Sequence, residues 1–155
     1  MKKRLGILLI PVVAAGLVVG CGGDDDPVEP TTPAVTPPPN LSGTYDLQSL
    51  TGVVTGNFPI GPPIAVGTFT LMQNSASGDT ATGSLSLSLT VTDPRDGSVT
   101  EIADQGMFTV RTDGSWEQTG QQQQALGTYT LAGNVLTVIV TEPAAAVSTT
   151  VWQRQ

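Results

Sequence analysis

Nine consecutive residues, 84–92, alternate strictly between hydroxyl-bearing and aliphatic side chains, and no other feature limits the fold as much. In an extended strand the aliphatic members share one face: Leu85, Leu87, Leu89 and Val91. One apolar and one wet face are typical of a strand in an antiparallel sheet. No segment after Pro39 shows helical spacing, and only 12% of the residues are charged, so the usual helix formers are scarce. The sequence therefore predicts an all-β domain.

Turn signals divide the rest of this domain into short strands. Asp113-Gly114 and Gly133-Asn134 suit tight hairpins because both pairs tolerate positive φ, and Ser77–Asp79 and Asp93–Gly97 form looser turns. We expect strands at about 43–51, 64–74, 80–93, 98–112, 115–120, 126–132, 135–142 and 146–153, with a bulge near Ala103–Gly106.

Eight short antiparallel strands leave two exposed edges unless the sheet closes. We therefore predict a single small up-and-down barrel over residues 40–155, closed by pairing of segment 43–50 with segment 147–152. The glycine-x-aromatic-x-aliphatic pattern of Gly43–Leu47 recurs at Gly67–Leu71 and Gly127–Leu131, which indicates shared core positions. The inward set that we assign is Tyr45, Leu47, Phe69, Leu71, Leu85, Leu87, Leu89, Val91, Phe108, Val110, Tyr129, Leu131, Leu136, Val138 and Val140.

The first twenty residues have the layout of an export signal. Lys2, Lys3 and Arg4 precede an apolar run over 5–19, which is shorter than the roughly 20 residues of a membrane span. The tetrad Val18-Val19-Gly20-Cys21 resembles a bacterial lipobox, with Val18 where leucine is more usual. The resemblance implies a signal peptide over 1–20 and lipidation of Cys21 by diacylglycerol and fatty acids such as palmitate. An ordinary secretory signal with a chance cysteine, or an N-terminal anchor helix, stays open.

Residues 21–39 read as a tether. An acidic cluster, Asp24-Asp25-Asp26, precedes six prolines within 27–39. Such sequence favours extended polyproline II, which rises about 3.1 Å per residue, so residues 22–39 reach about 50 Å at most. The acidic cluster resembles tracts that direct lipoproteins to the cell surface in some bacteria, although a solvated linker explains it equally well. We expect a lipid-anchored protein of the bacterial cell envelope, in the outer membrane or at the cell surface rather than in the inner membrane.

Charge and composition exclude several classes of function. Without residues 1–20, three arginines face thirteen acids, 3 − 13 = −10, which disfavours nucleic acid and anionic headgroups as partners. There is no histidine, and Cys21 is the single cysteine, so neither Ser-His catalysis nor a disulfide within the domain is available. The acidic residues fall mostly at expected turns and strand ends, and Asp93–Gly97 has too few carboxylates for calcium. We expect no enzyme, no metal and no cofactor.

Both ends of the domain resemble small bacterial lipocalin-like lipoproteins. Leu41-Ser42-Gly43-Thr44-Tyr45 opens the first strand, and Trp152-Gln153-Arg154 closes the last one. Lipocalins open with Gly-x-Trp and carry an arginine near the last strand that packs on the tryptophan. The resemblance implies those roles for Gly43, Tyr45 and Arg154, with tyrosine in place of tryptophan and no helix after the last strand.

Two hypotheses of function follow. In the first, the barrel binds or carries a small apolar ligand on the interior residues Tyr45, Phe69, Leu87, Phe108, Tyr129 and Val138. It requires an open-ended cavity of about 300 Å³ or more. In the second, the domain has a filled core and is a structural or interaction module of the envelope. Gln121–Gln124 is expected to be a loop over one barrel end, while Trp116 and Trp152 either line a binding mouth or are half-buried. Protein partners are not specified by the sequence.

Overall fold

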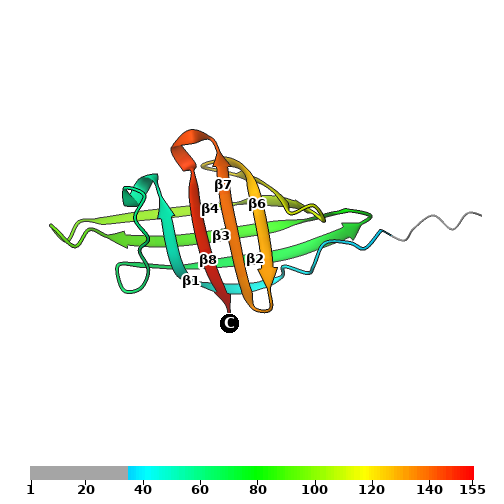
Figure 1. The fold of residues 1–155 in the computed structure, drawn as a ribbon, viewed down its shortest axis with the longest axis horizontal. Coiled ribbons are helices and arrows are strands. Elements are labelled where there is room, and N and C mark those ends of the chain that lie inside the picture. Colours follow the sequence, from blue (N-terminus) through cyan, green and yellow to red (C-terminus); the bar gives the residue numbers. More distant parts are fainter. Residues whose placement is uncertain (1–34) are drawn as a thin grey trace, which may run out of the picture. The chain divides into compact units, whose positions relative to one another are not determined.

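The computed structural model describes residues 35–155, which form a closed barrel of eight antiparallel strands in chain order (Figure 1). The strands are β1 Gly43–Gly52, β2 Ala65–Ser77, β3 Thr80–Thr92, β4 Val99–Arg111, β5 Ser115–Gly120, β6 Gln124–Ala132, β7 Val135–Glu142 and β8 Ser148–Arg154. Two 3₁₀ turns, η1 Val53–Thr55 and η2 Ala144–Ala146, follow β1 and β7. The expected signal peptide, the lipid site at Cys21 and most of the tether lie outside the described residues.

Pairing of the first and last strands closes the sheet. Tyr45 lies opposite Arg154, Leu47 opposite Trp152, and the pairing continues to Gly52 opposite Ser148. Each of the other neighbours in the barrel is consecutive in sequence. The predicted up-and-down barrel is therefore confirmed. β2 and β4 are longer than their neighbours β1 and β5, which pair with them only at Thr68–Leu71 and at Gly106–Val110.

The predicted bulge near Ala103–Gly106 is wrong. β4 pairs with β3 without a register shift from Val99 to Arg111, and the shifts occur instead at Leu47/Ser49, Gln73/Ser75 and Leu126/Gly127. The apolar alternation breaks in β4 for another reason. Asp104 occupies an inward position, directly opposite Leu87, where an apolar residue is usual.

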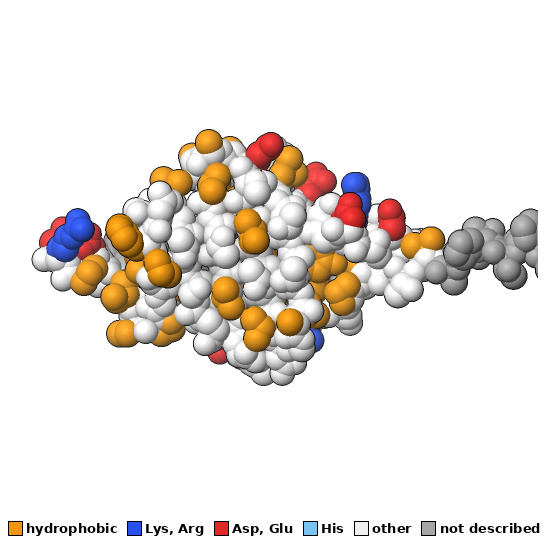
Figure 2. All heavy atoms as spheres, viewed as in Figure 1, with side chains coloured by type: hydrophobic (Ala, Val, Ile, Leu, Met, Phe, Trp, Pro, Cys, Tyr) orange, Lys and Arg blue, Asp and Glu red, His pale blue; other side chains and the backbone are white. Residues whose placement is uncertain are grey.

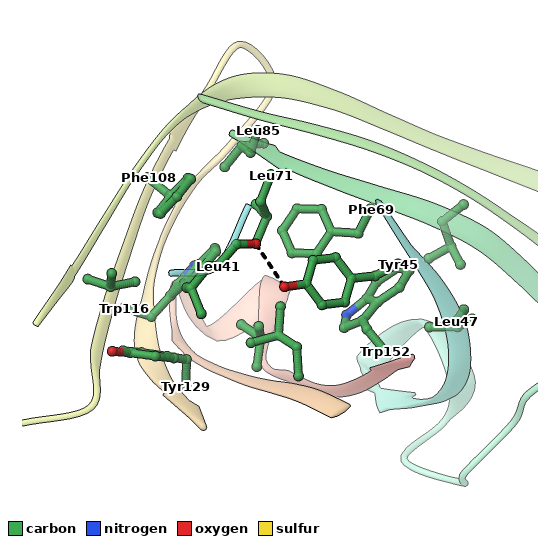
Figure 3. Close-up of a cluster of buried hydrophobic side chains, with 14 of the residues drawn as sticks. Leu41, Tyr45, Leu47, Phe69, Leu71, Leu85, Phe108, Trp116, Tyr129 and Trp152 are labelled. Carbon is green, nitrogen blue, oxygen red and sulfur yellow. Dashed lines mark hydrogen bonds between the residues drawn. The ribbon is translucent and has the colours of Figure 1, made fainter. Parts of the chain in front are cut away.

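One end of the barrel, which we call the sealed end, is closed by Leu41, Tyr45 and Arg154. The Tyr45 hydroxyl donates to the Leu41 carbonyl at 2.8 Å, the dashed line in Figure 3, and accepts from Arg154 Nε at 3.0 Å. The guanidinium carbon of Arg154 lies 5.1 Å from the Tyr45 ring centroid, and its Nη2 donates to the Asn40 carbonyl. The contact between Arg154 and Tyr45 that the resemblance implies is therefore present.

Aromatic rings fill the half of the barrel next to the sealed end (Figure 3). Trp116 stacks on Phe108 with ring centroids 5.5 Å apart and an interplanar angle of 1°. The ring centroids of Phe69 and Trp152 lie 5.2 Å apart. Trp116 and Trp152 are only 1% and 2% exposed, so the expectation of half-buried tryptophans is wrong. Within the described residues neither indole N–H has a hydrogen-bond partner, a cost that the large apolar area of each ring offsets.

A glycine opposite a large ring makes this packing possible. Gly83 on β3 faces Phe108 on β4, and a Cβ on Gly83 would lie 2.6 Å from Phe108 Cε1 and 2.2 Å from the Met72 carbonyl oxygen. No side chain fits there without displacing the ring or the neighbouring strand. The inward glycine therefore sets the position of Phe108 in the core.

Candidate functional site

The other end of the barrel holds a cavity of about 190 Å³. Its wall consists mainly of inward aliphatic and aromatic side chains near the middle and the open end of the strands. These are Leu50 of β1, Phe69 of β2, Leu87 and Leu89 of β3, Ile102 of β4, Ala125 of β6, Val138 and Val140 of β7, and Trp152 of β8. The wall is apolar because each strand turns every second side chain into the barrel, and these alternate residues are mostly aliphatic or aromatic.

Three of the six residues predicted to bind a ligand lie on this wall: Phe69, Leu87 and Val138. The other three, Tyr45, Phe108 and Tyr129, also belong to the core, but they lie toward the sealed end and do not line the cavity. Phe69 and Trp152 separate the two regions, since both line the cavity and both contact the aromatic cluster.

The predicted volume of about 300 Å³ or more is wrong, because the cavity measures about 190 Å³. Trp116 is buried against Phe108, Tyr129 and Phe69 at the sealed end and does not line the cavity. A volume of about 190 Å³ is nevertheless in the range of an apolar protein cavity that takes up benzene, about 150 Å³.

The mouth of the cavity has an apolar rim, formed by Val53 of η1 and by residues 145–147 at η2. Val53 is 53% exposed, and Phe58, in the loop after η1, is 72% exposed. The loop is held in place by Thr55 Oγ1, which accepts from Gly52 N and donates to the Gly52 carbonyl, and by Val53 N, which donates to the Val147 carbonyl. Figure 2 shows apolar side chains gathered on the surface over the loop that carries η1, at the left of the view.

The loop between β5 and β6 forms the polar side of the mouth. Gln122 and Gln123 line the cavity, as expected for a loop over one barrel end. The loop is fixed by backbone bonds from Gly120 N to the Gln123 carbonyl and from Gln121 N to the Gln105 carbonyl, both 2.8 Å long.

Asp104 is the one charged side chain on the cavity wall, and it is only 6% exposed. Its Oδ1 accepts from the backbone N–H of Gln105 at 2.9 Å and of Gln122 at 3.0 Å, and its Oδ2 accepts from Gln118 Nε2 at 3.1 Å. Gly120 provides the space, because a Cβ there would lie 1.8 Å from Asp104 Oδ2. A buried carboxylate that accepts only neutral donors is unusual, and this makes Asp104 the most distinctive polar group of the site.

Sequence reasoning missed Asp104. The sequence predicts that the acidic residues serve turns and solubility. This holds for Asp93 and Asp96, which accept the backbone N–H groups of Arg95 and Ser98 in the β3–β4 turn. The sequence did contain a signal for the burial of Asp104. Ile102, Asp104 and Phe108 are separated by even numbers of residues, so in an unbroken strand their side chains share one face.

Residues 35–155 contain neither a metal-binding cluster nor a membrane-spanning helix. No group of three or more His, Cys, Asp or Glu side chains is placed there to hold a metal ion. No helix in this part of the chain has the length and apolar character needed to cross a bilayer. Comparisons of the chain with family models, with curated proteins and with solved structures found no match.

Proposed function

We propose that this chain is a lipid-anchored protein of the bacterial cell envelope whose lipocalin-like barrel binds or carries a small, mainly apolar molecule. The observation that carries the proposal is the cavity of about 190 Å³, with a wall of aliphatic and aromatic side chains and an exposed rim. An apolar cavity with a few polar groups at one side is the usual form of a small-molecule site.

The membrane attachment rests on the sequence. Val18–Cys21 has the lipobox pattern, and the proline-rich segment after Cys21 suits a spacer between lipid and barrel. Lipid is needed for attachment because residues 35–155 carry nine acids against three arginines, 3 − 9 = −6, and anionic headgroups repel such a surface. We place the anchor in the outer membrane or at the cell surface.

The lipocalin-like assignment rests on the barrel and on its sealed end. Closure between β1 and β8, together with Arg154 packed on Tyr45 beside Gly43, is the arrangement that the sequence resemblance implies. A Cβ on Gly43 would lie 3.1 Å from Arg154 Nε, so glycine suits this position.

The size of the cavity limits the ligand. A cavity of this volume accommodates one benzene-sized group. A longer ligand has to extend through the mouth between η1, η2 and the β5–β6 loop. A long acyl chain does not fit inside without movement of the aromatic cluster.

One observation favours a second function, that of a structural or interaction module with no ligand. The half of the barrel next to the sealed end is filled by Phe108, Trp116 and Tyr129, and the void that remains is below the expected volume. A module of this kind needs only the tether and a stable barrel.

Ligand binding is tested on residues 21–155 carrying Cys21→Ser, so that no acyl chain of the protein enters the cavity. Ethylbenzene is added, and binding is followed by tryptophan fluorescence and methyl NMR, because Trp152, Leu87 and Val138 line the cavity. Saturable shifts confined to these residues support the proposal. Their absence up to the solubility limit of ethylbenzene, together with no small molecule in native mass spectra of the protein from its own host, favours the structural module.

A further inference from the structure

We propose that the ligand carries a cationic amine, held by Asp104, on a small apolar body; this inference rests on the proposed function. The starting observation is a carboxylate that is 6% exposed and is the one charged side chain on a mainly apolar wall. Burial of an ionised group is costly unless an opposite charge or several hydrogen bonds compensate for it.

The protein itself supplies no positive charge here. The three donors that reach Asp104 are two backbone N–H groups and one side-chain amide, all neutral. Residues 35–155 contain no lysine or histidine, and none of the arginines at 95, 111 and 154 lines the cavity. The charge of Asp104 is therefore left for a partner that the described residues do not contain.

Asp104 retains the capacity to bind such a partner. A carboxylate offers about four acceptor positions. Oδ1 accepts two hydrogen bonds and Oδ2 accepts one, which leaves one position on Oδ2. An ammonium N–H is a fitting donor, because hydrogen bonds between ionised groups are roughly twice as strong as neutral ones.

The surroundings select for positive charge combined with apolar surface. Leu87 lies directly opposite Asp104 in the β3–β4 pair, so an ammonium bound at Oδ2 has its carbon skeleton against the aliphatic wall. The other polar side chains of the cavity, such as Gln118 and Thr150, are neutral. A net charge of 3 − 9 = −6 over residues 35–155 attracts cations toward the mouth and repels carboxylate ligands.

The fixed geometry of the site favours an organic cation over a metal ion. Calcium needs six or more oxygen ligands, and among the described residues no second carboxylate stands beside Asp104. A primary or secondary amine needs only one ion pair and an apolar pocket for its body.

The inference is tested with three probes of similar size on residues 21–155 carrying Cys21→Ser. Ethylbenzene is neutral, benzylamine has an ammonium in place of the methyl group, and benzoate is an anion. We expect benzylamine at pH 7 to bind at least tenfold more tightly than ethylbenzene, and benzoate to bind less tightly than either. A ratio of benzylamine to ethylbenzene affinity near one overturns the inference but leaves the proposed function standing. Failure of all three probes to bind overturns both.

A variant identifies the residue. Asp104→Asn keeps the size of the side chain and an oxygen for both backbone donors, and the Gln118 amide is free to rotate and accept from the new NH₂ group. We expect the ratio of benzylamine to ethylbenzene affinity to fall from at least ten in the wild-type protein to near one in the variant. Glu101→Gln is the matched control, because it removes the same charge from the exposed face of the same strand and leaves the preference intact.

If Asp104→Asn retains the preference, the cation binds elsewhere and the inference is wrong. If the variant fails to fold, the wild-type protein still decides. Nuclear Overhauser contacts between the benzylamine methylene group and the side-chain amide of Gln118, which donates to Asp104, support the assignment, and contacts elsewhere overturn it.

Discussion

Arg154 and Tyr45 are 109 residues apart in sequence and adjoin across the seam of the barrel, where Arg154 Nε donates to the Tyr45 hydroxyl at 3.0 Å. The same hydroxyl donates to the Leu41 carbonyl, so one tyrosine oxygen connects three segments: the residues before β1, β1 itself and β8. Leu41 lies outside the strands and is held at the sealed end by this bond and by its own N–H, which donates to Gln73 Oε1 of β2 at 3.0 Å.

Arg154→Ala is expected to lower the free energy of unfolding by about 1–3 kcal/mol, since it removes hydrogen bonds to a charged donor and the contact with the ring. Urea denaturation measures the loss. Arg95→Ala, in the exposed β3–β4 turn, is the control and should change the free energy by less than about 0.5 kcal/mol. Equal effects of the two substitutions would show that the contact at the seam contributes nothing to stability.

Gly83→Ala is expected to destabilise the barrel by about 1–3 kcal/mol, because the added methyl group overlaps the Phe108 ring and the Met72 carbonyl. Thermal unfolding checks the result. Ser86→Ala, three residues along on the exposed face of the same strand, should leave the melting temperature nearly unchanged. A stable Gly83→Ala protein with an unshifted Phe108 ring would contradict this account of the core.

Leu87→Phe is expected to weaken ethylbenzene binding at least tenfold, because the larger side chain occupies part of a cavity of about 190 Å³. Leu87→Ala should instead admit a two-ring compound such as naphthalene. Isothermal titration or fluorescence gives the affinities. Ser86→Phe places the same ring on the outer face and should not alter binding, so a loss of affinity there would place the bound molecule outside the barrel.

Cys21→Ser is expected to abolish incorporation of a clickable palmitate analogue and to leave the protein unprocessed or released from the membrane. Labelling followed by membrane fractionation tests this prediction. Incorporation of label into the Cys21→Ser protein would mean that the lipobox assignment is wrong.

Strand pattern and turn chemistry were sufficient to predict the barrel. The alternation from Ser84 to Thr92 sets which side of β3 faces inward, and glycines with positive φ occur in the expected hairpins, at Gly114 and Gly133. Once eight strands run in sequence order, closure between β1 and β8 follows from the cost of open edges. Local sequence and global topology agree, which is why these features were predictable.

The site was only partly predictable, because a void depends on volumes summed across several strands. Phe69 and Leu87 were assigned to a binding interior and do line the cavity, whereas Phe108 faces inward at the other end. Trp116 is only 1% exposed and belongs to the aromatic cluster at the sealed end, and its strand propensity alone does not reveal this burial. Asp104 is not singled out by the sequence, because the acidic residues are expected mostly at turns and strand ends, and only the register of β4 places it opposite Leu87.

The path of β1 also determines which end of the barrel is free for a ligand to enter and leave the cavity under the proposed function. β1 begins beside Arg154 at the sealed end and finishes at Gly52, next to the rim of the cavity. Residues 35–40 therefore join the barrel at the end away from the mouth, and they do not stand in the path by which a ligand leaves. The exit for the ligand proposed above therefore lies between η1, η2 and the β5–β6 loop, at the end of the barrel away from residues 35–40.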